Sequence, residues 1–235
     1  MSLPLDAIGR EFRFYLDFLR QYNLLPARSG RQMEKRRFQT AFAKSILRGK
    51  RPRVGGHEFS MVMLRSLAGT DVRRVIVVDR TLKPRDGLTA FLGHRFTERV
   101  TRNLRHNLQL VLKLYGISLL YSDTDVPNGS VFEVILRRIK EASFCIFDDR
   151  ETEVRPNVFI ELGAAVALAR PYFYFRFEQK RTVKIGRRKE KIQAPSDLAG
   201  MLCLPYSTYE DLLRELAVRL PRFLLDRKLA QSRRA

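Results

Sequence analysis

The sequence predicts an α/β fold in its C-terminal two thirds, from about Gly87 onward. Short apolar stretches there alternate with longer segments whose apolar residues recur at helical spacing. That alternation is typical of a parallel sheet with crossover helices. The expected strands are 88–93, 117–121, 143–147, 172–177 and 201–204.

The helices expected between these strands have recognisable ends. The expected caps and stops are Thr97 and Gly116, the capping box of Ser130 with Glu133, Asn157 and Pro171, and Thr208 with Asp211. The last helix is expected to kink or break at Pro221, and the helix after Asn157 is apolar nearly all round, so it should be covered on most sides. Five strands in this pattern predict a five-stranded parallel sheet of the flavodoxin-like type.

Residues 1–86 precede this pattern and differ from it. Amphipathic helices are expected at 5–22 and 33–47, and Pro and paired Gly then interrupt the pattern at 51–56. The β-branched stretch 74–79 predicts an extra strand whose place in a sheet stays open. We therefore divide the chain into a basic helical extension at 1–56, a connecting segment at 57–86 and the α/β domain at 87–235.

The charge of the chain bears on its partners. Lys and Arg number 45 against 25 Asp and Glu, a formal net charge of +20, which favours a polyanionic or acidic partner. The most basic segments run from Arg28 to Arg53 and from Lys180 to Lys191. We expect nucleic acid or an acidic protein to bind there, and a merely solvated basic surface is the alternative.

Metal binding, export and membrane insertion find no support in the sequence. Cys145 and Cys203 lie in apolar, strand-like stretches without a CxxC pair, and the three His are scattered, so we expect reduced core cysteines and no metal. The N-terminal residues include Asp6 and lack an apolar signal segment, and charges interrupt the most apolar stretch, 158–175. We expect a cytoplasmic protein that needs no cofactor and does not enter the membrane.

Ligands of open α/β sheets bind beyond the carboxyl ends of the strands, where the strand order reverses. The loops at 93–96, 122–129 and 148–157 should therefore converge on one crevice. Surface turns, loop acids that bond their own backbone and a simple helix cap are the structural alternatives for these positions. The residues expected to contact substrate are Gly93, His94, Arg95, Asp123, Asp125, Gly129, Ser130, Asp148, Asp149, Asn157 and Gly163.

Glu161 is the residue expected to do chemistry. It is the acid of the otherwise apolar helix NVFIELGAAVALA, and an ionised carboxylate is costly to bury without a partner, so it should face a cleft. Gly163 in the same helix suggests close approach by another group, because Gly costs about 1 kcal/mol within a helix. The alternative is a first-turn acid that interacts favourably with the helix dipole.

A resemblance to known families accompanies these residues. The strings FLGHRF, DTDVPNGS, SFCIFDDR and PNVFIELGAAVAL, between about Gly87 and Leu225, resemble the TIR-like, predicted nucleotide-binding families and the related nucleoside 2-deoxyribosyltransferases. The resemblance implies a TIR-like fold. It also places Glu161 where enzymatic TIR domains carry the glutamate that cleaves the N-glycosidic bond of NAD. The deoxyribosyltransferases use a glutamate in a similar helix as nucleophile, so Glu161 matches both families.

The leading hypothesis is a TIR-like NAD glycohydrolase that releases nicotinamide, in which Glu161 stabilises an oxocarbenium-like transition state. The resemblance further implies a role in antiviral defence, a mobile loop at 122–129 and a homo-oligomer in which a neighbour completes the cleft. The enzymatic alternative is a nucleoside or nucleotide 2-deoxyribosyltransferase or N-glycoside hydrolase. The second alternative is a non-catalytic module that binds a nucleotide or nucleic acid. Residues 1–80, the basic 180–191 insertion and the absence of Trp depart from the TIR pattern.

Overall fold

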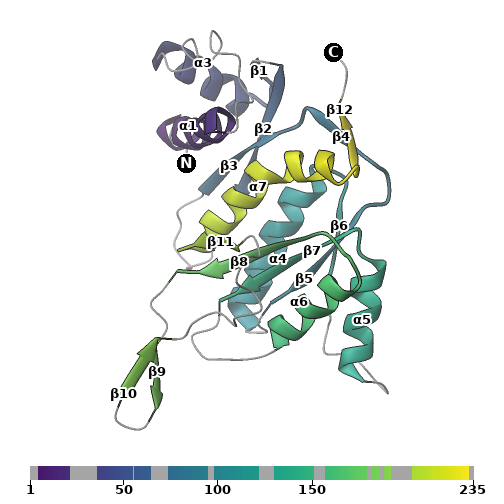
Figure 1. Ribbon diagram of the computed structural model, residues 1–235. Coiled ribbons are helices and arrows are strands. Elements are labelled where there is room, and N and C mark those ends of the chain that lie inside the picture. The colour runs from purple at the N-terminus through teal and green to yellow at the C-terminus, as the bar shows by residue number, and fades with distance from the viewer. Residues whose placement is uncertain are drawn as a thin grey trace. The chain divides into compact units, whose positions relative to one another are not determined.

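The computed structural model of the 235-residue chain describes residues 5–21, 36–54, 56–64, 74–94, 98–121, 130–150, 157–178, 182–185, 188–191 and 203–232. The chain divides into two compact units, whose elements are labelled in Figure 1. Unit 1 comprises Met1–Asp86, Asn103–Gly116 and Leu213–Ala235, and unit 2 comprises Gly87–Arg102 and Ile117–Leu212. No helix in the described part of the chain is long and apolar enough to cross a membrane.

Unit 2 is built on a five-stranded parallel sheet, as predicted. Its strands are β5 (Thr89–Gly93), β6 (Ser118–Leu120), β7 (Phe144–Asp149), β8 (Tyr172–Phe177) and β11 (Cys203–Tyr206). They lie in the order β11-β8-β7-β5-β6, and every pairing is parallel. This is the flavodoxin-like order, which reverses between β5 and β7. The ends of these two strands, at Gly93 and Asp149, therefore mark the edge where a ligand cleft is expected.

The helices after these strands are α4 (Glu98–Lys113), α5 (Val131–Glu141), α6 (Asn157–Ala167) and α7 (Tyr209–Asp226). The predicted cap of α7 is confirmed. Thr208 donates its hydroxyl to the Asp211 carboxylate at 2.7 Å, and the Asp211 N–H donates back to the Thr208 hydroxyl at 3.2 Å. The predicted box at Ser130 is wrong, because the Ser130 side chain makes no capping bond and its carbonyl instead accepts the Glu133 N–H at 3.0 Å.

Of the two alternatives expected at Pro221, a kink or a break of the last helix, the break is wrong. Pro221 lies inside α7, which continues to Asp226. Proline removes one backbone hydrogen bond and crowds the preceding turn. Leu216, Leu220 and Leu224 are fully buried on both sides of it, so burial of the helix face offsets that cost.

The two helices α5 and α6 pack on one face of the unit 2 sheet. Residues 158, 161, 162 and 165 of α6 are buried, which is the spacing of a single helix face. Ile160 and Val166 on the outer side are 47% and 49% exposed, so the expectation that this helix is covered on most sides is wrong. The core beneath the helices combines Phe91, Cys145, Phe147 and Tyr174 of the sheet with Ile135, Ile139, Val158, Leu162 and Ala165.

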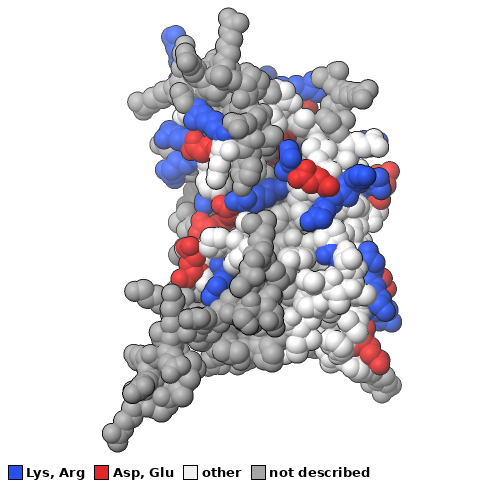
Figure 2. Space-filling view, in the orientation of Figure 1, with Lys and Arg blue, Asp and Glu red and all other residues white. Residues whose placement is uncertain are grey.

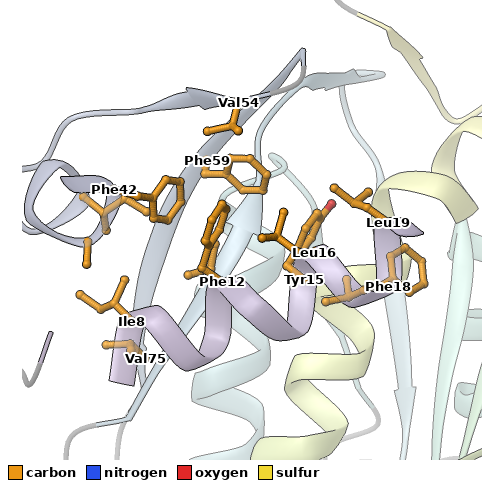
Figure 3. Packing of buried hydrophobic residues seen from close by; sticks show 14 residues of the cluster. Ile8, Phe12, Tyr15, Leu16, Phe18, Leu19, Phe42, Val54, Phe59 and Val75 are labelled. Carbon is orange, nitrogen blue, oxygen red and sulfur yellow. The ribbon is translucent and has the colours of Figure 1, made fainter. Parts of the chain in front are cut away.

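Unit 1 contains an antiparallel sheet of β1 (Arg53–Val54), β2 (His57–Leu64) and β3 (Arg74–Asp79). The segment 57–86, expected to connect two parts of the chain, thus supplies the middle of this sheet. Helices α1 (Leu5–Gln21) and α3 (Arg36–Leu47) share a core with it. Figure 3 shows the aromatic centre, in which Phe12 stacks on Phe42 with ring centroids 3.8 Å apart and meets Phe59 edge-on at 5.6 Å.

Two further strand pairs lie in segments that the sequence presents as basic loop or tail. β9 (Thr182–Ile185) and β10 (Arg188–Lys191) form an antiparallel hairpin, and β12 (Ala230–Ser232) pairs with β4 (Leu82–Pro84). Neither was expected, because charged residues hide the alternating pattern by which strands are found.

The described charged residues mix both signs. Figure 2 shows Lys and Arg beside Asp and Glu on the face in view, and Arg214 of α7 pairs with Glu11 of α1 within unit 1 at 2.8 Å. Residues 28–35 and the side chains of 180–191 lie outside the described part of the chain. Binding of a polyanion by the segments from Arg28 to Arg53 and from Lys180 to Lys191 therefore stays a prediction.

Candidate functional site

The carboxyl ends of β5 and β7 and the helix α6 bring Gly93 and Glu161 together in unit 2. Gly93 pairs with Phe147 across the β5–β7 ladder, so both residues point to the same face of the sheet. That face carries α6, whose buried stripe includes Glu161. Gly93 and Glu161, which are 68 positions apart in sequence, thus meet at the point where the strand order reverses.

Glu161 is buried, and one of its carboxyl oxygens has no hydrogen bond from a described neighbour. Its side chain is 5% exposed, and its Oε2 atom has no hydrogen-bond partner among the residues that the structure describes. Burial raises the pKa of Glu161 from 4.5 to about 8. A carboxyl group in this state is protonated at neutral pH, and it becomes a strong hydrogen-bond acceptor when a ligand donates to it.

Gly93 makes room for the Glu161 carboxyl group. A Cβ atom at position 93 would overlap Glu161 Oε2 and lie 2.6 Å from the Phe147 ring, closer than real side-chain atoms approach. By contrast, a Cβ atom at Gly163 meets nothing within 4 Å in the described structure, and Gly163 is exposed. The close approach that the sequence places at Gly163 therefore occurs at Gly93.

The two adjacent acids at the end of β7 point to opposite faces of the sheet. Asp149 follows Phe147 by two positions, so it lies on the Glu161 face, where Tyr174 donates to its Oδ2 at 3.0 Å. Asp148 lies on the other face and accepts a short hydrogen bond from Tyr206. Burial raises the pKa of Asp148 to about 6, although Tyr206 and the nearby Arg150 oppose this. Of these two acids, Asp149 is therefore the one on the same face of the sheet as Glu161.

Arg150 and two aromatic rings form a feature of this edge that the sequence did not reveal. The Arg150 guanidinium lies 3.9 Å from the ring centroid of Tyr209 and 4.7 Å from that of Phe177. These contacts fix a cation directly after β7. The signal in the sequence is the DDR triplet, in which the arginine directly follows the two acids at the end of the strand.

The other residues expected to contact substrate are placed as follows. His94 follows Gly93 and is buried, whereas Ser130 and Asn157 are exposed at the first turns of α5 and α6. Arg95, Asp123, Asp125 and Gly129 lie outside the described residues, as does the whole of the 122–129 loop. Their roles stay predictions.

The described His, Cys, Asp and Glu residues are the groups that could hold a metal ion. No group of three or more of them lies close enough to hold a metal ion. Neither Cys145 nor Cys203 forms a disulfide, and burial raises the pKa of the Cys145 thiol to about 12. This thiol is therefore inert packing in the core below α6.

Comparisons with known proteins found no matching family model and no matching curated protein. Among solved structures, the chain is similar to the CMP N-glycosidase BcmB of Clostridium botulinum, at 19% identity and a TM-score of 0.38, over 55% of this chain and 96% of that one. It is also similar to a 2-deoxyribosyltransferase of Bacillus psychrosaccharolyticus, at 20% identity and a TM-score of 0.36, over 53% of this chain and 90% of that one. Neither of these two is described as a TIR domain.

Proposed function

We propose that unit 2 cleaves the N-glycosidic bond of a nucleoside or nucleotide, with Glu161 as the catalytic carboxylate. The observation that carries this proposal is the buried Oε2 atom of Glu161, which lacks a partner in the described structure and lies against Gly93 at the switch point of the sheet. A buried acceptor without a partner is costly, so the site favours a ligand that donates hydrogen bonds to it. The hydroxyl groups of a ribosyl or deoxyribosyl ring are such donors.

Substrate binding would convert Glu161 into its reactive form. Hydrogen bonds from sugar hydroxyls favour the carboxylate over the protonated acid, so the pKa of Glu161 falls when substrate enters. The carboxylate oxygen then attacks the anomeric carbon, and the electron pair of the breaking C–N bond goes to the base, which takes up a proton from water as it leaves. Water, or a second base in a transferase, attacks the same carbon and releases the carboxylate.

The quoted resemblance supports this assignment because three of its four strings adjoin the same place in the sheet. FLGHRF ends β5, SFCIFDDR ends β7, and PNVFIELG begins α6, so the residues that resemble glycosidic-bond enzymes surround Gly93 and Glu161. NAD is the narrower substrate hypothesis. Its nicotinamide leaves as a neutral base from a cationic substrate, whereas the base of an ordinary nucleoside needs a proton to leave.

The test is release of free base by the purified full-length chain. Deoxynucleosides, ribonucleosides, CMP and NAD are incubated separately, with and without a second base as acceptor, and products are separated by chromatography. We expect cleavage of at least one substrate and a loss of about a thousandfold or more in Glu161→Gln, which keeps the shape and removes the charge. No release from any substrate, or equal release by both proteins, would sink the proposal.

Two further measurements assign the role of Glu161. A 2-fluoro-substituted nucleoside that slows the second step should leave a sugar adduct on Glu161, detected by mass spectrometry of peptides. Because the ionised form reacts and its pKa in the free protein is about 8, kcat/KM should rise with pH up to about that value and then level off. A fall in kcat/KM across the same range would instead make Glu161 a proton donor.

A further inference from the structure

Unit 1 contains a cavity of about 150 Å³ that has no part in the site around Glu161. Phe18, Leu19, Val218 and Leu225 belong to its predominantly apolar wall, and its polar side is formed by residues that include His57 and Asp79. Figure 3 shows Tyr15, Phe18 and Leu19 grouped at one end of α1. All of these residues belong to unit 1.

Asp79 is the centre of a closed hydrogen-bond network on the polar side of the cavity. Its Oδ2 accepts from the Tyr15 hydroxyl at 2.9 Å and contacts His57 Nδ1 at 2.6 Å. Its Oδ1 accepts from the Thr81 N–H at 2.8 Å and from the Thr81 hydroxyl. Each oxygen thus has two donors, so the carboxylate has no remaining capacity for a ligand.

The charge of Asp79 is stable in this setting. Burial by itself would raise the pKa of Asp79, but the hydrogen bond and charge of His57 and the two hydrogen bonds from Thr81 hold it below its usual value. The ionised carboxylate also fixes His57 with Nδ1 as the donor. The cavity therefore presents an oriented imidazole rather than an accessible acid.

Arg222 adds a cation to the cavity lining. Its Nε donates to Asp226 at 2.9 Å on the exposed side of α7, and a guanidinium has five N–H donors, so this pair does not exhaust it. Its side chain is 55% exposed, which leaves it able to turn toward a ligand. Among the described lining residues, Arg222 is the cation that favours an anion, while the acid Asp79 is already engaged.

We propose that this cavity is a second ligand site, which binds a small organic carboxylate that carries one apolar ring. A cavity of about 150 Å³ accommodates a molecule the size of benzene. The apolar wall takes the ring, and the Arg222 guanidinium pairs with the carboxylate. The proposal is independent of any activity at Glu161.

The test uses fluorobenzoate as the probe and fluorine NMR of the full-length chain as the readout. Fluorobenzamide and fluorobenzylamine, which share the ring and are neutral and cationic, serve as matched ligands. We expect fluorobenzoate to bind at least about fivefold more tightly than either, because a charge-assisted hydrogen bond is the stronger kind. Absence of fluorobenzoate binding, or equal binding of all three, would overturn the proposal.

Two substitutions place the probe in the cavity. Leu225→Trp adds bulk at a residue that is 38% exposed, so the fold should tolerate it, and we expect it to weaken binding about tenfold or more. Arg222→Gln should remove most of the preference for fluorobenzoate over fluorobenzamide. Glu161→Gln, in the other unit, should leave binding unchanged. Binding that Leu225→Trp does not weaken would locate the probe elsewhere and refute the assignment.

Discussion

Two buried carboxyl groups, Asp79 in unit 1 and Glu161 in unit 2, are held in opposite states. Their exposures are nearly equal, at 3% and 5%. Asp79 accepts hydrogen bonds from Tyr15 and Thr81 and pairs with His57, and its pKa is lowered. The Oε2 atom of Glu161 has no partner in the described structure, and burial raises the pKa of that residue to about 8.

This comparison shows that burial alone does not decide whether a carboxyl group is charged. Desolvation acts on both groups in the same direction, and hydrogen-bond donors reverse its effect only at Asp79. The hydrogen-bond acceptors of Asp79 are therefore used within its own unit. The Oε2 atom of Glu161 can still accept a hydrogen bond from a ligand. Four changes test this difference, from the largest expected effect to the smallest.

Asp79→Ala should be the most damaging change. It leaves the buried donors of Tyr15, His57 and Thr81 without their acceptor, which costs about 3–5 kcal/mol of unfolding free energy. Chemical denaturation measures the loss, and hydrogen exchange of β2 and β3 locates it in unit 1. The control is Asp86→Ala, at an exposed position of the same unit, for which a change within about 0.5 kcal/mol is expected. Equal stability of the two variants would contradict the network.

Ionisation of Glu161 should lower the free energy of unfolding as pH rises. Its pKa in the folded chain is raised, so its contribution to stability is complete below 4.5 and is lost as pH rises through about 8. At about 1.4 kcal/mol per tenfold change in proton affinity, the loss is roughly 3–5 kcal/mol as an upper bound. Glu161→Gln should therefore become more stable than the natural chain above pH 8. Asp79 behaves in the opposite way. Because its pKa is lowered, its contribution to the free energy of unfolding is lost only as pH falls through the lowered pKa. Parallel stability curves for Glu161→Gln and the natural chain would exclude a raised pKa at Glu161.

Gly93→Ala tests whether Glu161 depends on the space above β5. The added methyl group would overlap the carboxyl group and the Phe147 ring, so a loss of about 1–3 kcal/mol and displacement of Glu161 are expected. Gly163→Ala is the matched control, because nothing in the described structure lies within 4 Å of its added atom, and there the helix should gain about 0.5–1 kcal/mol. Thermal unfolding of both variants reports the difference, and a loss at Gly163 as large as that at Gly93 would count against it.

Tyr15→Phe should have the smallest effect. It removes one of the four donors to Asp79 and keeps the ring, so we expect a loss of about 1 kcal/mol. The pKa of Asp79 should also rise, which carbon NMR of its labelled carboxyl group measures. An unchanged pKa would mean that the Tyr15 hydroxyl does not support the charge.

The sequence predicted the sheet of unit 2 well, because its strands are apolar and separated by helices of clear period. It also singled out Gly93 and Glu161. The close approach by another group was expected at Gly163, whereas in the described structure it occurs at Gly93. It did not separate Asp148 from Asp149, since adjacent residues look alike until the strand register assigns each to a face. The strand β7 includes both acids and ends at Asp149, rather than before the pair, and composition does not reveal this boundary.

Unit 1 was harder to predict because its contacts join distant parts of the chain. Asp79 meets Tyr15 across 64 residues and His57 across 22, and no local pattern encodes either contact. One signal was present: the stretch RVIVVD places a lone acid at the end of a buried strand, where it needs donors. Its donors come from Tyr15, His57 and Thr81, which lie outside the α/β pattern that begins at Gly87.

The connectivity of unit 1 has a consequence for synthesis and dissection of the chain. Its pieces, Met1–Asp86, Asn103–Gly116 and Leu213–Ala235, enclose all of unit 2 in sequence, and β12 pairs with β4 across almost 150 intervening positions. A chain that emerges from the ribosome therefore has the material of unit 2 before unit 1 can close. Cutting after residue 212 would not free unit 2 from an intact neighbour, but would remove Val218 and β12 from unit 1 and leave its apolar core open to solvent.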